Sequence, residues 1–184
     1  MTQIQYPNDV SGSLQITHGS DGRLNVSSRS DTRSYYISRD AKQAYSVVFD
    51  DPDCDVGDEF FFLQNDSTDK ELVIDSIGIN ATLVGSFKLQ FEDGALSGAT
   101  TLTPVNLNHG SSNNAVVSCF GNALLTGTSI PDGVIDHVAI NVAGHEEFRL
   151  ADRVRLGQGD AISLLYDRGT ANNIVEGVVF FFFE

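Results

Sequence analysis

The chain has 184 residues, of which 41% are hydrophobic and 20% are charged, a composition typical of one globular domain with an extension. Its formal net charge is -14, and such an acidic chain repels phosphates, which argues against direct binding of DNA or RNA. No apolar run approaches the length of about 18 residues that spans a membrane, and the N-terminus lacks the features of a signal peptide. We therefore expect no membrane span and a protein that is made in the cytosol and not exported by the usual route.

Residues 1–43 are predicted to form a polar N-terminal arm. The arm has five basic and four acidic side chains, whereas the rest of the chain has six basic and 21 acidic ones. An arm of this charge can lie on an acidic neighbour that the body would avoid, although a solvated tail remains the alternative. We expect the arm to contact other subunits, because Arg and Tyr anchor interfaces. The candidate residues are Arg29, Arg33, Tyr35, Tyr36 and Arg39.

From Tyr45 onward the pattern changes to short strands separated by turns, which predicts an all-β, antiparallel two-sheet sandwich over residues 44–184, jelly-roll-like, with the arm extended from it. Strict alternation places Phe87, Leu89 and Phe91 on one inward face. The run over 71–83 alternates in two stretches and indicates a β-bulge between them. One helical turn is expected within 121–129. The predicted strands cover 45–49, 59–64, 71–83, 86–91, 99–105, 115–120, 134–142, 146–150, 161–166 and 173–183.

Two predicted strands, 59–64 and 173–183, have consecutive apolar residues, so both of their faces need cover. The cover is the chain's own arm, a long loop or a neighbouring subunit. In the last strand alternation separates Val179, Phe181 and Phe183 from Val178, Phe180 and Phe182, and only one set can enter the core. We therefore expect an obligate homo-oligomer. The interface candidates in this strand are Phe180, Phe181, Phe182 and Phe183.

No motif predicts catalysis, a cofactor or a metal. The acidic turn over 50–58 fails as an EF-hand loop, because Val56 and Phe62 stand where a glycine and a bidentate glutamate are needed. It is interpreted as a surface turn, with a different kind of calcium site as the alternative. The sequence beginning at His145 departs from the HExxH zinc motif, since its last position is Arg149. Two cysteines are too few for a disulfide framework, so we expect free thiols.

Three segments give the chain a resemblance to a known family. SSRSDTRSYYISRDAKQAYSVVFD (27–50), LGQGDAISLLY (156–166) and the phenylalanine-rich terminus resemble small virion proteins encoded beside the capsid genes of tailed bacteriophages. The likeness covers residues 23–184. It implies a jelly-roll or related sandwich that decorates (cements) the capsid exterior, mostly as a trimer bound to the major capsid protein, with no cofactor and no catalysis. The alternative is a tail-fibre or host-recognition module that binds carbohydrate.

Overall fold

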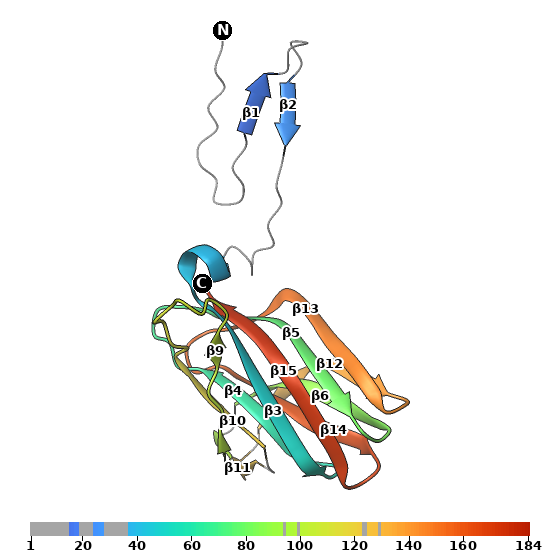
Figure 1. Ribbon diagram of the computed structural model, residues 1–184. Coiled ribbons are helices and arrows are strands. Elements are labelled where there is room, and N and C mark those ends of the chain that lie inside the picture. The colour runs from blue at the N-terminus through green and yellow to red at the C-terminus, as the bar shows by residue number, and fades with distance from the viewer. Residues whose placement is uncertain are drawn as a thin grey trace.

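The computed structural model describes residues 15–18, 24–27, 37–93, 95–98, 100–122, 125–128 and 130–184. The strands from β3 onward are antiparallel, and the long ones pack as a two-sheet sandwich, as the sequence predicts (Figure 1). β1 and β2 pair with each other in a separate two-stranded sheet. The elements are β1 (Gln15–His18), β2 (Leu24–Ser27), η1 (Ile37–Ala41), β3 (Ala44–Cys54), β4 (Glu59–Asn65), β5 (Leu72–Ala81), β6 (Gly85–Glu92), β7 (Ala95–Ser97), β8 (Thr100–Thr101), β9 (Val105–Asn106), β10 (Val117–Gly121), β11 (Thr126–Thr128), β12 (Pro131–Ile140), β13 (Gly144–Leu156), β14 (Ala161–Gly169) and β15 (Asn173–Phe183).

The eight long strands pair in a nested order, in which the first strand along the chain pairs with the last, the second with the second to last, and so on. Among them β3 pairs with β15, β4 with β14, β5 with β13, and β6 with β12. The pairs alternate between two sheets, whose orders are β13-β5-β15-β3-β9 and β12-β6-β14-β4-β10-β8. This nested pairing, in which a long double strand wraps around one core, is the jelly-roll arrangement that the sequence favours.

Inward-facing side chains from both sheets form one main core, and the alternation predicted for β6 is confirmed there. Phe87 and Leu89 are fully buried, and the half-buried Phe91 packs against the same cluster. On β15 the inward row includes Gly177, where a Cβ atom would lie 2.3 Å from Cζ of Phe49. Only glycine at this position leaves room for the Phe49 ring, which packs on Phe61 with 4.9 Å between centroids.

The bulge predicted in the 71–83 run is present in β5. Relative to β15, the register shifts between Phe180, which pairs with Ser76, and Phe181, which pairs with Ile74. Asp75 is therefore the extra residue of β5, and it resets the alternation so that the apolar residues on its two sides reach the same core. The four residues concerned, Leu72, Ile74, Ile77 and Ile79, are all fully buried.

The apolar strand β4 is covered on both faces by its own chain. A register shift against β14 leaves Phe60 beside a bulge, and both Phe60 and Phe61 enter the main core. Phe62 faces outward and lies in a second cluster with Leu96 and Leu125. These two residues belong to the segments that pair as β7 and β11, so a small two-stranded flap covers the outside of β4. Of the alternatives for this strand, a long loop is the one observed.

Two features differ from the sequence-based expectation. Within the described residues, packing against the sandwich already includes Ile37, ahead of residue 44, because η1 folds onto the sheet and buries Ile37. The helical turn expected within 121–129 is wrong for the described part of that segment, where residues 126–128 form the strand β11. Pairing with β7 provides the hydrogen bonds that an isolated helical turn leaves unmade. Both cysteines are free thiols, as expected.

Candidate interface on the outer face of the five-stranded sheet

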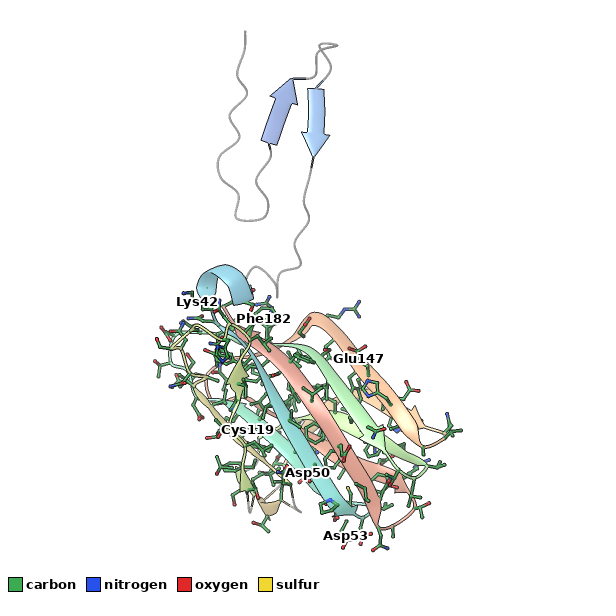
Figure 2. The ribbon with its side chains drawn as sticks, in the orientation of Figure 1. Lys42, Asp50, Asp53, Cys119, Glu147 and Phe182 are labelled. Atoms are coloured by element: carbon green, nitrogen blue, oxygen red, sulfur yellow. The ribbon has the colours of Figure 1, made fainter. Side chains whose placement is uncertain are left out.

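The helical turn η1 covers one end of the outer face of the sheet that contains β15. Ile37 packs there with Ala44, Val73 and Phe182 in a small cluster separate from the main core. The segment is tied down by backbone hydrogen bonds, from the Phe183 amide to the Gln43 carbonyl at 3.1 Å and from the Gln43 amide to the Ile37 carbonyl at 3.4 Å. Figure 2 shows Phe182 close to Lys42, at the end of the sandwich from which the chain leaves toward its N-terminus.

Next to this cluster, apolar side chains continue along the same face, and the described residues give them no comparable cover. Strand pairing places Phe180 between Ser46 and Ser76, and Val178 between Val48 and Gly78. These six positions share the outward face with Val105 of β9. Val48 is 70% exposed and Val105 is 64% exposed, while Phe180 and Val178 are half-buried. We call this set the apolar stripe: Val48, Val105, Val178 and Phe180.

The stripe has polar borders on two sides. Toward the far end of the sandwich, the next outward pair is Asp50 with Glu176, and both residues are exposed. On the β13 side, the ring of His145 lies over Gly78, where a Cβ atom would be 2.8 Å from Cε1 of His145. An apolar strip with a polar rim is the usual anatomy of a protein–protein contact.

The structure places the four phenylalanines predicted for the interface in three different environments. Phe181 and Phe183 lie in the main core, which corrects their assignment, since a side chain that fills the sandwich cannot contact another subunit. Phe182 is buried beneath Ile37 of its own chain. Of these four residues only Phe180, in the apolar stripe, remains an interface candidate.

The interface candidates of the arm are mostly outside the described residues. Arg29, Arg33, Tyr35 and Tyr36 fall there, so their role stays a prediction. Arg39 belongs to η1, and its side chain is not among those described. Sequence reasoning missed Val48, Val105 and Ile37. Val48 could have been found from the alternation of residues 45–49, which places it opposite to the inward Val47 and Phe49.

The acidic turn between β3 and β4 is held by hydrogen bonds within the chain. The Asp55 amide donates to Oδ2 of Asp58 at 2.9 Å, and the Asn172 amide donates to Oδ1 of Asp55 at 2.9 Å. Within the described residues no group of three or more acidic, histidine or cysteine side chains is arranged to hold a metal ion. The carboxylates of this turn therefore act in the described structure as acceptors for backbone amides.

Removal of divalent cations is expected to leave the melting temperature unchanged. A structural ion would couple its binding to folding, and stripping it would then lower the melting temperature. Differential scanning calorimetry of the full chain, with and without excess chelator, measures this. A fall of several degrees in the chelator sample would revive the calcium interpretation of the turn over 50–58.

A group of charged side chains lies on the surface around Asp167. His137 Nε2 is 3.8 Å from Oδ2 of Asp167, whose other oxygen pairs with Lys88. The Lys88 hydrogen bond lowers the pKa of Asp167, as expected of a surface ion pair. In the described residues, no helix has the length and apolar character needed to cross a membrane.

Comparison with known proteins adds no relative. The chain matches no protein-family model, and neither the curated proteins nor the solved structures include a similar one.

Proposed function

We propose that this chain is a decoration (cement) protein of a bacteriophage capsid, which binds the capsid exterior as an oligomer and stabilises the shell. The observation that carries the proposal is the apolar stripe, an open strip of Val48, Val105, Val178 and Phe180 on a sandwich whose other apolar strand, β4, is covered by its own flap. A monomer would leave this strip in water. A subunit in an assembly buries it.

Charge supports the same proposal. Outside the arm the chain has six basic and 21 acidic residues, which suits a surface that faces solvent and repels other particles. The arm is close to neutral with five basic side chains, and these can lie on the acidic border formed by Asp50 and Glu176 of a neighbouring copy or on an acidic capsid surface. The arm and the stripe are then the two contact regions of the assembly.

The family resemblance supplies the partner. The segments 27–50 and 156–166 are similar to virion proteins encoded beside capsid genes, which makes the major capsid protein the expected partner and a homotrimer the expected oligomer. The location is then the outer surface of the virion, after synthesis in the host cytoplasm. No cofactor and no catalytic step form part of this function.

Deletion of residues 1–36 is expected to weaken capsid binding about 30-fold or more while the sandwich stays folded. Within the described residues, packing against the sandwich begins at Ile37, so the deletion removes no described core residue. Loss of one interface anchor costs about 2 kcal/mol or more, which corresponds to about a 30-fold change in affinity. The measurement is co-sedimentation with capsids that lack this protein, comparing the full chain with the truncated one at matched concentrations.

Circular dichroism and the melting temperature of the truncated chain serve as the folding control. Equal binding by the two chains would contradict the role of the arm. If the full chain fails to bind capsids but binds phage tails or a host-cell polysaccharide, the decoration proposal is wrong and the host-recognition alternative replaces it.

A further inference from the structure

The end of β3 contains a buried carboxyl group that the proposed function does not use. Asp51 is only 3% exposed, although it lies among the exposed acidic residues of the turn over 50–58. Its Oδ1 accepts a hydrogen bond from the Asp53 amide at 3.1 Å, whereas its Oδ2 has no hydrogen-bond partner among the described residues. A buried carboxylate oxygen without a partner is costly, and the neutral acid avoids most of that cost.

Every charged group that acts on Asp51 favours its protonated form. Burial raises the pKa of Asp51, and the negative charges of Asp58, Asp53 and Asp50 raise it further against the opposing hydrogen bond from the Asp53 amide. Strand β15, which pairs with β3 at this point, contributes the non-titratable residues Asn173 and Val175. No cation contributes to the shift.

The turn that follows Asp51 is hydrogen-bonded to β14, and a buried cysteine, Cys54, directly precedes it. The Gly57 amide donates to the Tyr166 carbonyl at 2.7 Å, and the Tyr166 amide donates to the Asp58 carbonyl at 2.9 Å. Cys54, the last residue of β3 before this turn, is fully buried, and its side chain belongs to the main core. Burial raises the pKa of the Cys54 thiol, and the carboxylates of Asp51 and Asp58 add to the effect. Cys54 is therefore a natural reporter of whether the turn is closed.

We propose that the β3–β4 turn is a proton-held clasp, which stays closed while Asp51 is protonated and opens more readily when Asp51 loses its proton. Figure 2 shows Asp53 at the end of the sandwich opposite to Lys42 and Phe182, so the clasp is remote from η1.

The sign of the pH dependence follows from the two states of Asp51. In the closed turn its pKa is raised, whereas in the open turn the carboxyl is solvated and titrates in its ordinary range. The closed turn is therefore most stable below the ordinary aspartate pKa. That stability is lost as the pH rises from the ordinary aspartate pKa to the raised pKa of the closed state. For each unit between these two pKa values, the equilibrium constant for opening increases roughly tenfold.

The two cysteines allow this opening to be measured with an internal control. Cys119 is buried in β10, and burial alone raises the pKa of its thiol to about 12. Labelling with 4,4′-dithiodipyridine between pH 4.5 and 7.5, read by peptide mass spectrometry, gives the rate ratio of Cys54 to Cys119. The thiolate fraction of both cysteines increases with pH in the same proportion well below their pKa values, so this part of the pH dependence cancels in the ratio. The carboxylates near Cys54 disfavour its thiolate, so they oppose a rise in the ratio and cannot produce one. The ratio for the full chain is expected to rise as the pH increases across the range, because the raised pKa of Asp51 in the closed turn makes opening easier once the carboxyl ionises.

Asp51→Asn keeps a neutral side chain at every pH and should make the ratio constant. Asp53→Asn is the matched control, because it keeps the backbone amide bonded to Asp51 and removes only one of the three neighbouring negative charges, while burial, the largest cause of the raised pKa of Asp51, remains, so the rise should persist. A constant ratio in the unmodified chain would overturn the clasp, as would a rise that survives in Asp51→Asn. Should Asp51→Asn fail to fold, the pH series of the unmodified chain still decides by itself.

Discussion

Replacing Phe181 by alanine is expected to cost about 3–5 kcal/mol of folding stability, the range measured for large aromatic residues removed from protein cores. Phe181 is 1% exposed and stacks on Tyr45 with 5.6 Å between ring centroids. It also meets Phe183 edge to face at 6.2 Å. The substitution leaves a cavity between the sheets and removes these aromatic contacts together. Because a domain of this kind is stable by only about 5–15 kcal/mol, most of that margin is at risk.

The adjacent residue is the matched control for this prediction. Phe180 is half-buried in the apolar stripe between Ser46 and Ser76, so Phe180→Ala removes less buried surface and is expected to cost about 1 kcal/mol. Urea denaturation followed by circular dichroism, at one fixed protein concentration, gives both values. Equal losses for the two variants, or a larger loss for Phe180→Ala, would contradict the assignment of faces along β15.

The architecture could be predicted because it depends on local alternation. Phe87, Leu89 and Phe91 reveal their shared face directly, and the spacing of Ile74 and Ile77 reveals the bulge in β5. Each of these patterns involves neighbours along one strand, where the side-chain period of two leaves little freedom.

The covers of the apolar strands could not be predicted from the same rules. The flap on β4 forms when β7 pairs with β11, with Ser97 opposite Thr126. Both segments have weak strand patterns, and they lie far apart in the sequence. The side chain that covers Phe182 is that of Ile37, which is an apolar residue in a polar stretch of the arm. The sequence indicates that such strands need cover, but the choice of the covering segment depends on how the loops fold back in three dimensions.

The buried carboxyl of Asp51 was hidden for a different reason. Asp50, Asp51, Asp53, Asp55 and Asp58 are one acidic run in the sequence, and nothing local distinguishes the member that is buried. Alternation along β3 places Asp51 on the inward side with Val47 and Phe49, but the acidic character of the run had favoured a surface turn. Burial of one carboxyl among five required the pairing of β3 with β15 to be known.

The unmodified chain is expected to be an obligate oligomer, most simply a trimer. Complete burial of a valine or phenylalanine side chain is worth roughly 1.5–3 kcal/mol, so leaving the stripe in water forfeits several kcal/mol and invites aggregation. The stripe includes Val48 at 70% and Val105 at 64% exposure, beside the half-buried Phe180 and Val178. The trimer follows from the family resemblance, whereas the need for a partner surface follows from these side chains.

Phe180→Asp places a charge in the middle of the stripe and is expected to give a folded monomer. Phe180 is outside the main core, so the sandwich should keep its circular dichroism spectrum while the contact between subunits is lost. This variant separates association from folding, which Phe181→Ala cannot do.

Multi-angle light scattering of the purified full chain at micromolar concentration tests association most directly. The mass of one chain is 19.9 kDa, so a trimer gives three times 19.9 kDa, about 60 kDa, and Phe180→Asp should fall to the single-chain value. A stable, soluble species of 19.9 kDa for the unmodified chain would show that the apolar stripe needs no partner, and would contradict its role as an assembly surface.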